Sequence, residues 1–313
     1  FAQRKITHAI LNQAQICLRV LQEANIPVLA IEGNHDNAPY GTKSSWLRYL
    51  SDWSLLKLLE PGNVGNGEPF YSHWDDDTQR GGYIDLDCGL RVLGSSWYGA
   101  AAPRAIEQIA EAIGTLPPAP GPSILLFHHG LEGQISRYAG ALRYGEVLPL
   151  QKAGIDYLAL GHIHKSYAEE GWIFNPGSIE ANNVEEGQFE RGAFLVEIDK
   201  DGTITPELKT DYQQRPIVRL QLKMRTQDAM ESVAEGAIAL ITQSIKSKKL
   251  IPDQQPIVEL RITGTVGFDR LELDTRELQK QLKEQSNALI FLLRYDVDEA
   301  AYASPIAEEA SRL

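Results

Sequence analysis

The sequence of 313 residues contains only two cysteines, Cys17 and Cys88. Two cysteines provide no disulfide framework, which excludes the small secreted scaffolds that depend on several disulfides and favours a reducing compartment, the cytoplasm. No apolar run approaches the ~20 residues that a membrane-spanning helix needs, so the sequence predicts no such helix and no membrane partner.

An excess of positive charge is also absent, because 42 acidic residues outnumber 30 basic ones and the net charge is −12. Affinity for duplex nucleic acid rests largely on neutralisation of phosphates, so this balance excludes a broadly basic nucleic-acid binder. It remains compatible with a local basic groove, or with bound metal ions that supply the positive charge. The 43% hydrophobic and 23% charged residues are typical of globular proteins.

The N-terminus has neither an initiator methionine nor the pattern of a signal peptide. An amphipathic helix is predicted over residues 3–24, followed by a strand over 27–32. A strand after a helix normally completes a right-handed crossover from an earlier parallel strand. We therefore expect an N-terminal strand upstream of Phe1.

Helices and strands alternate along the rest of the chain, with short antiparallel strands between turn residues. This alternation predicts layered sheets flanked by helices. The composition shifts near residues 210–216, after which a β-α-β-α-β order is predicted. The expected organisation is a large domain over residues 1–212, a smaller domain over 213–297 and a tail over 298–313.

Polar side chains follow three of the predicted buried strands, at the point where each strand ends. They are Asn34, His35 and Asp36 after "PVLAI", His128 and His129 after "SILLF", and His162 and His164 after "DYLAL". In open α/β sheets, ligands collect outside the carboxyl ends of the strands. We therefore expect these side chains to converge.

The spacing of His162 and His164 is typical of a metal site. In an extended segment, residues two apart point the same way, with Cα atoms about 6–7 Å apart. This separation suits two metal ions about 3.5–4 Å apart, each bound by one imidazole. Imidazole suits Zn, Fe and Ni, whereas a carbonyl oxygen such as that of Asn34 suits Mn and Mg.

Each pattern taken alone also has an ordinary structural interpretation. His-x-His pairs occur by chance, "NHD" is a common turn sequence, and two histidines at a strand end can simply be polar. His129 is ambiguous, since it can line the pocket without binding metal. Convergence of all three segments at one edge of the sheet favours the metal site.

Together, the segments "GNHD", "LLFHHG", "LGHIH" and "NPGS" make the chain similar to the calcineurin-like metallophosphoesterase superfamily. "HHGLEGQ" before "LPL", "DYLALGHIHK" and a further domain from "RPIVRL" resemble its DNA-repair nuclease branch, the SbcD-type subunit and its meiotic-recombination relatives. The resemblance covers residues 1 to about 295. It implies an α/β protein with a layered α/β/β/α core, whose first strand precedes Phe1, and a smaller α+β cap domain.

The resemblance also implies roles for individual residues. Asn34, His128, His162 and His164 resemble the family's ligands for two divalent metal ions, most often Mn²⁺. His35 resembles the catalytic histidine that protonates the leaving oxygen, and Asp36 its orienting partner. Gly33 and Gly161 would allow close backbone approach.

The chain departs from the family pattern at its start. An Asp-x-His motif and a Gly-Asp motif, whose Asp bridges the two metals, are expected upstream of Phe1. Three histidines and one asparagine supply no carboxylate to offset two divalent cations. We therefore expect these 313 residues to hold metal weakly.

The function that the resemblance implies is metal-dependent hydrolysis of phosphodiester bonds by a DNA nuclease (exonuclease, with single-strand endonuclease activity as a further option) in double-strand-break repair. The alternatives are a phosphatase or phosphodiesterase acting on small nucleotides or phosphoproteins, and a non-catalytic DNA-binding scaffold.

The partners that the resemblance implies are DNA, an SbcC-type SMC-like ATPase and a second copy of the chain, at the nucleoid. Candidate dimer residues are Leu11, Leu18, Leu47 and Leu50. Candidate DNA contacts are Arg215, Arg219, Lys223 and Arg225, and the lysines 246, 248 and 249. Lysines at a helix C-terminus also simply complement the helix dipole.

Overall fold

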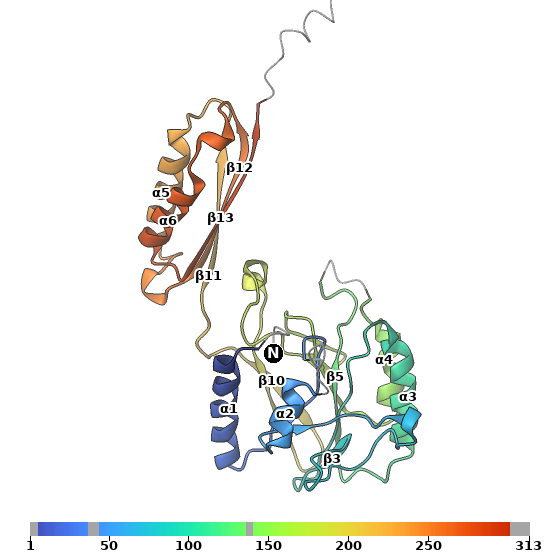
Figure 1. Ribbon diagram of the computed structural model, residues 1–313. Coiled ribbons are helices and arrows are strands. Elements are labelled where there is room, and N and C mark those ends of the chain that lie inside the picture. The colour runs from blue at the N-terminus through green and yellow to red at the C-terminus, as the bar shows by residue number, and fades with distance from the viewer. Residues whose placement is uncertain (1–5, 37–43, 136–139, 301–313) are drawn as a thin grey trace, which may run out of the picture. The chain divides into compact units, whose positions relative to one another are not determined.

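The computed structural model describes residues 6–36, 44–135 and 140–300, and the chain divides into two compact units (Figure 1). The first comprises residues 1–179 and 189–211, and the second residues 180–188 and 212–313. Residues 180–188 thus belong to the second unit, although a single boundary near residue 212 would leave them in the first. Within the described residues, no helix is long and apolar enough to cross a membrane.

The first unit contains a six-stranded sheet with the strand order β3-β4-β5-β6-β8-β7. Its strands are β3 (Tyr83–Asp85), β4 (Arg91–Leu93), β5 (Ser123–His128), β6 (Tyr157–Gly161), β7 (Tyr167–Glu169) and β8 (Ile173–Asn175). The four central strands are parallel, and the edge strands β3 and β7 are antiparallel to their neighbours. The carboxyl ends of β4, β5 and β6 therefore meet at one edge of the sheet.

Strand β5 is buried on both faces, and its side chains alternate between two cores. Leu125 and Phe127 pack in the core that includes residues of α3 and α4, whereas Ile124 and Leu126 pack against Leu59 and its neighbours on the other face. This alternation places a second layer of strands opposite the helices. The layered α/β/β/α core predicted from the sequence is confirmed.

Two smaller sheets complete the first unit. One is the parallel pair of β1 (Leu29–Ala30) and β2 (Lys57–Leu58). The other is the antiparallel hairpin of β9 (Ala193–Ile198) and β10 (Ile204–Lys209). Only two residues of the expected strand 27–32 form the strand β1, and its partner β2 is equally short. The chain then leaves β1 for the turn that carries Asn34.

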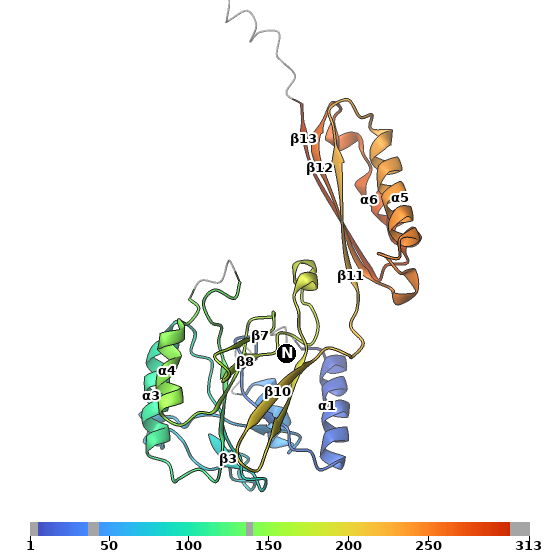
Figure 2. The same ribbon diagram turned by 180° about the vertical axis from the view of Figure 1, so that it is seen from behind.

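Helices cover the two sides of this unit (Figures 1 and 2). The four helices are α1 (His8–Glu23) and α2 (Trp46–Asp52) on one side, and α3 (Ala102–Gly114) and α4 (Tyr144–Lys152) on the other. Ser45 caps α2 by accepting a hydrogen bond from the amide of Arg48, and a proline opens α3 in its first turn.

The second unit is a βαβαβ fold of three parallel strands with the order β11-β12-β13. Its elements are β11 (Ile217–Met224), α5 (Glu231–Lys246), β12 (Ile257–Val266), α6 (Thr275–Ser286) and β13 (Ile290–Glu299). The β-α-β-α-β order predicted from the sequence is confirmed, and each helix serves as a crossover between parallel strands. Strand β13 extends two residues into the segment expected as a tail.

A charged pair connects β3 to β4 in the first unit. Arg91, which is 4% exposed, donates from Nε and Nη2 to the two carboxylate oxygens of Asp85, at 2.7 and 2.9 Å. This bidentate hydrogen bond lowers the pKa of Asp85 below its ordinary value of 3.8, more than burial raises it. The pair therefore stabilises the fold above about pH 3.8 and loses that contribution as the pH falls through the folded-state pKa.

We expect Asp85→Asn to lower the free energy of unfolding at pH 7 by about 1–3 kcal/mol, since it removes a charge-assisted hydrogen bond from a buried arginine. Urea denaturation at pH 7 and at pH 3 would measure it, with the exposed neighbour Asp87→Asn as control. The deficit should shrink at the lower pH. An equal deficit at both pH values would contradict the assigned role of the charge.

Candidate metal site

Three of the predicted ligands converge at the carboxyl edge of the sheet in the first unit. Asn34 follows β1, His128 ends β5 and His162 follows β6. The Oδ1 atom of Asn34 lies 3.0 Å from Nε2 of His128, and Nδ1 of His162 lies 3.3 Å from the same nitrogen. Two donor atoms, from segments 94 and 34 residues away in the sequence, thus lie within contact distance of His128 Nε2.

These separations fit a shared divalent cation. Two donor atoms each about 2.1 Å from one ion lie about 3.0–3.4 Å apart in octahedral or tetrahedral coordination. Within the described residues, no group of three or more His, Cys, Asp or Glu side chains is arranged to hold a metal ion. The converging set consists of two imidazoles and one amide, so it could bind one cation by three neutral donors.

Two glycines create the space that His128 occupies. A Cβ atom on Gly33 would lie 2.7 Å from Cε1 of the imidazole, and one on Gly161 would lie 3.1 Å from its Nδ1. Both are closer than ordinary van der Waals contact. The prediction that these glycines allow close approach is confirmed.

Burial keeps the two clustered imidazoles neutral. Desolvation, followed by the charges of neighbouring histidines, lowers the pKa of His128 to about 3 and that of His162 to about 4. His35 and His164 are among the neighbours that lower both values, which places all four imidazoles in one electrostatic environment. At neutral pH the ring nitrogens of His128 and His162 thus keep lone pairs available for a cation.

The expected extended conformation from His162 to His164 is wrong. Strand β6 ends at Gly161, and His162 has a φ of 89°, a conformation that residues other than glycine rarely adopt. Such strained residues persist only where the surroundings hold them, and they concentrate at functional sites. His162 therefore reaches His128 through this turn.

Asn175 holds the turn that carries His162 and His164. It is fully buried at the end of β8, and its Nδ2 donates to the carbonyl oxygens of Ile163 and Lys165, at 2.7 and 2.8 Å. The amide of Ser178 donates to the carbonyl oxygen of His164, between these two acceptors. The "NPGS" segment therefore fixes three consecutive carbonyls of this turn.

His35 and Asp36 lie in the turn after β1, where His35 is exposed. The Asp36 carboxylate accepts a hydrogen bond from the amide of Gly33 at 3.0 Å, which closes the turn. Glu32, just before it, accepts from Ser45, and burial raises its pKa more than this bond lowers it. The roles of His35 in proton transfer and of Asp36 in orienting it stay predictions.

His129 is buried and bonded to the backbone. The amide of Gly130 donates to its Nδ1 at 3.0 Å, and its Nε2 lies 3.2 Å from the carbonyl oxygen of Gly99. These contacts account for both ring nitrogens and favour the structural interpretation of this histidine.

Trp97 was missed by the sequence analysis. Its ring lies 5.1 Å from that of His162 and 5.6 Å from those of His128 and His129, measured between centroids. The available signal was its position after strand β4, whose carboxyl end adjoins that of β5. The rule that identified the three histidine segments also applies to this loop.

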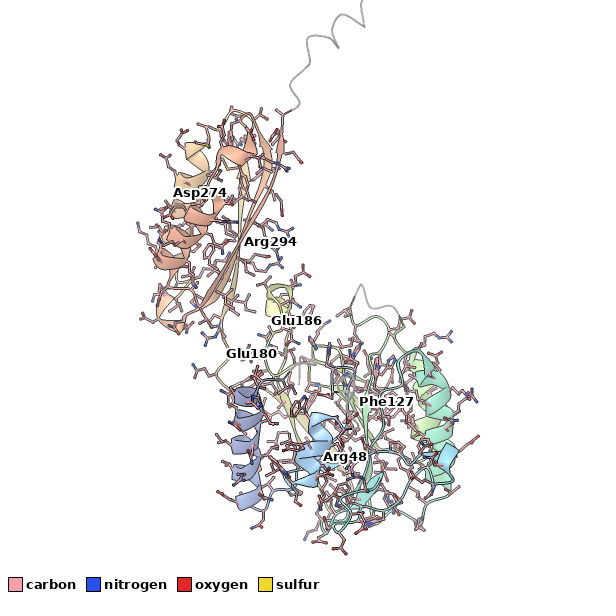
Figure 3. All side chains as sticks on the ribbon, viewed as in Figure 1. Arg48, Phe127, Glu180, Glu186, Asp274 and Arg294 are labelled. Atoms are coloured by element: carbon pink, nitrogen blue, oxygen red, sulfur yellow. The ribbon has the colours of Figure 1, made fainter. Side chains whose placement is uncertain are left out.

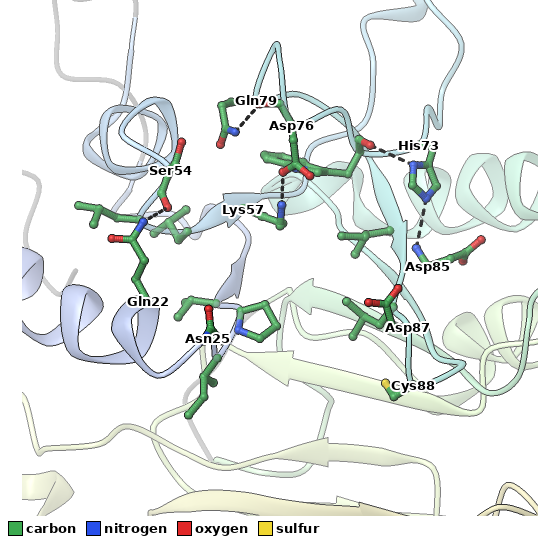
Figure 4. Close-up of a pocket in the computed structure, with 18 residues that line it drawn as sticks. Gln22, Asn25, Ser54, Lys57, His73, Asp76, Gln79, Asp85, Asp87 and Cys88 are labelled. Carbon is green, nitrogen blue, oxygen red and sulfur yellow. Dashed lines mark hydrogen bonds and ion pairs between the residues drawn. The ribbon is translucent and has the colours of Figure 1, made fainter.

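A cavity of about 680 Å³ lies elsewhere in the first unit (Figure 4). Its lining includes Lys57 of β2, and His73 and Asp76 from the segment that leads to β3, rather than residues that follow β5 and β6. Lys57 pairs with Asp76, and His73 contacts the backbone of Trp74 and Asp85. The cavity is therefore separate from the candidate metal site, and its polar side chains are engaged with each other or with the backbone.

A family model for the calcineurin-like phosphoesterases matches residues 4–166, more than half of the 313 residues. The chain belongs to the calcineurin-like phosphoesterase family. Members of this family use divalent metals. The matched segment contains Asn34, His128, His162 and His164, so the candidate site lies entirely inside the phosphoesterase region.

Curated relatives of this phosphoesterase are named DNA double-strand break repair protein Mre11. The protein from Sulfolobus acidocaldarius is 22% identical over 83% of this chain and 61% of its own length. The one from Saccharolobus solfataricus is 25% identical over 96% and 71%, and the one from Sulfurisphaera tokodaii 27% over 67% and 51%. The chain thus spans about half to seven-tenths of these relatives.

We expect Asn175→Asp to lower the free energy of unfolding by at least ~2 kcal/mol, because the carboxylate loses both donated hydrogen bonds and faces two carbonyl oxygens in a buried position. Thermal and urea denaturation would measure it. Asn66→Asp, the same change at an exposed asparagine, is the matched control. Equal stability of the two variants would show that Asn175 does not hold the turn.

Proposed function

We propose that this protein is a metal-dependent DNA nuclease that hydrolyses phosphodiester bonds in double-strand-break repair. The observation that carries the proposal is the convergence of Asn34 Oδ1, His128 Nε2 and His162 Nδ1 at separations of 3.0 and 3.3 Å. Membership of the phosphoesterase family supports the reaction class, and the printed names of the relatives support DNA repair.

The proposed cofactors are two divalent ions, most often Mn²⁺ in this reaction class. Asn34, His128 and His162 would hold one of them, and His164, from the same turn as His162, is the proposed ligand of the second. A bound divalent ion polarises phosphoryl oxygens and lowers the pKa of a coordinated water. The neutral amide and imidazoles bind without cancelling the positive charge that attracts a phosphate.

His35 is the proposed general acid. It is exposed in the turn next to Asn34, so it can reach a phosphodiester bound at the metal site. Protonation of the departing oxygen at this position makes that oxygen a better leaving group. The Asp36–Gly33 hydrogen bond supports this role by fixing the turn on which His35 lies.

For the intact protein, we expect Mn²⁺-dependent degradation of linear duplex DNA that a chelator abolishes. His128→Ala should abolish it, because it removes the central ligand. His35→Asn should lower the rate about 10²–10⁴-fold, the range for a lost general acid, while Mn²⁺ still binds. Gel assays of DNA cleavage beside a chromogenic phosphodiester would measure both.

The control for these variants is His8→Ala, at an exposed histidine of α1. If the protein cleaves the chromogenic substrate but leaves the DNA uncleaved, the result would favour the alternative, a phosphodiesterase of the same family acting on small nucleotides. DNA binding without any hydrolysis would favour a scaffold.

The proposed DNA-binding surface is the open face of the three-stranded sheet in the second unit. Parallel sheets are normally covered on both faces, but α5 and α6 lie on one face only, and Arg294 lies on the side away from Asp274 of the helical face (Figure 3). Arg219, Lys223, Arg261 and Arg294 are exposed along the three strands.

Two of these arginines support binding of a polyanion. Arg261 and Arg294 are direct cross-strand neighbours, a like-charge pairing that destabilises a sheet. Their carboxylate partners lie 3.6 and 3.8 Å away, and one of these, Glu259, is shared with Arg219. A phosphate backbone would relieve this repulsion. Arg215, by contrast, donates to the carbonyl oxygen of Gln255.

We expect the double substitution Arg261→Ser and Arg294→Ser to weaken DNA binding and to lower the salt slope of log Kd by about 2, one unit for each lost phosphate contact. Fluorescence anisotropy over a salt series would measure the slope. Lys280→Ser with Lys283→Ser, at exposed lysines of α6, is the control. An equal slope change in both double variants would exclude the sheet face.

A homodimer is the proposed assembly, through residues different from those expected. Leu50 is 1% exposed, and Leu11, Leu18 and Leu47 pack around it in a core cluster. The exposed apolar side chains of the same helices include Ile10, Ile16, Val20 and Tyr49, and the exposed Trp53 directly follows α2. Helix α1 has no buried residue, so this outer face is available to a second copy.

We expect Ile16→Glu with Val20→Glu to convert a dimer into a monomer, because the two substitutions introduce charge into an apolar contact. Analytical ultracentrifugation would measure the masses, with Ile290→Glu in the second unit as control. A dimer that survives the double substitution would exclude this face.

The remaining proposed partner is an SbcC-type SMC-like ATPase, with the protein in the cytoplasm at the nucleoid. The sequence resemblance supports the ATPase, and the DNA-repair names of the relatives support a place at the nucleoid.

A further inference from the structure

Trp97 is in contact with three histidines at the carboxyl ends of β5 and β6, namely His128, His129 and His162. Its indole is tilted by 30° against His162, stacked at 23° on His129 and nearly perpendicular, at 74°, to His128. Centroid separations of 5.1–5.6 Å are within the range in which aromatic rings attract one another. One indole thus bounds the imidazoles of both candidate ligands.

The loop that carries Trp97 is itself anchored to β5. The next residue, Tyr98, stacks on Phe127 with ring centroids 6.1 Å apart, and the carbonyl oxygen of Gly99 lies 3.2 Å from Nε2 of His129. Consecutive residues of one loop therefore contact consecutive residues of the strand that ends in His128. These contacts leave the indole little freedom to move away from the imidazoles.

The backbones of Gly33 and Gly161 also lie close to the His128 ring. A glycine has no side chain that could pack against the imidazole and fix its rotamer. Trp97 is a large side chain that meets both His128 and His162. Removing it would leave a space in which both rings could adopt other rotamers.

We infer that Trp97 is a positioning residue that holds the imidazoles of His128 and His162 at the separation at which they share one cation. The inference rests on the proposed metal-dependent function, because it takes the converging donors to be a cation site. Trp97 acts through the two histidines. Its expected effect is therefore on metal affinity and imidazole geometry.

The experiment compares Trp97→Ala and Trp97→Phe with the unmodified chain. Isothermal titration with Mn²⁺ gives the affinity, and crystal structures of both variants give the Nε2–Nδ1 separation of His128 and His162. Trp172→Phe, at a tryptophan buried in the core of the same unit, is the matched control for lost packing. His128→Ala identifies Mn²⁺ binding at any other site.

We expect Trp97→Ala to weaken Mn²⁺ binding about 10- to 100-fold, the usual effect of removing groups that orient metal ligands. Trp97→Phe should recover part of this loss, because a ring remains against both histidines. Trp172→Phe should lower the melting temperature and leave the affinity unchanged. In the Trp97→Ala crystal structure, the 3.3 Å separation should be lost.

An affinity within twofold of the unmodified chain for Trp97→Ala, or an unchanged imidazole geometry in its crystal structure, would overturn the inference. If neither this chain nor the intact protein binds Mn²⁺ that His128→Ala removes, the proposed function fails instead. The crystal structures then decide the positioning role separately, since the separation of the two imidazoles is measured without metal.

Discussion

The close approach of two backbone segments to the imidazole of His128 is the constraint on which the candidate site depends. Gly33 and Gly161 leave no room for a Cβ atom beside this ring. Since Gly33 precedes Asn34 and Gly161 precedes His162, the glycines that admit the imidazole also bring the two other donors to it. The convergence of three distant segments therefore follows from one steric requirement.

The surroundings of the cluster serve to keep neutral donors in place. Burial disfavours the charged form of His128 and His162, so both rings remain uncharged at neutral pH. Asn175 fixes the turn after β6 through its carbonyls, and His162 tolerates a positive φ because that turn is held. The geometry of the candidate ligands is thus determined by groups that are not themselves candidate ligands.

Much of this arrangement could be predicted from the sequence. Strand ends are visible as apolar runs followed by polar residues, and parallel strands direct those ends to one edge, which identified Asn34, His128 and His162. The starts of α3 and α6 coincide with Pro103 and Asp274, residue types that favour helix starts. The conformation of His162 could not be predicted, because local propensity disfavours a positive φ and only tertiary contacts impose it.

Contacts between loops were also beyond the sequence. Trp97 shows no periodicity or spacing relative to the histidines, and its contact with them depends on how the β4 and β5 loops pack. The parallel arrangement of the second unit was implicit in its β-α-β-α-β order. The assignment of residues 180–188 to that unit was not, because it depends on packing such as the contact of Gly187 with Ile217. The sequence pattern thus predicted the secondary structure better than the long-range packing.

The most direct test of the account is anomalous diffraction from crystals soaked in Mn²⁺. The account predicts an anomalous peak about 2.1–2.3 Å from Asn34 Oδ1, His128 Nε2 and His162 Nδ1, the distance expected for oxygen and nitrogen ligands of a divalent cation. A strong peak elsewhere, with no peak at these three atoms, would contradict it.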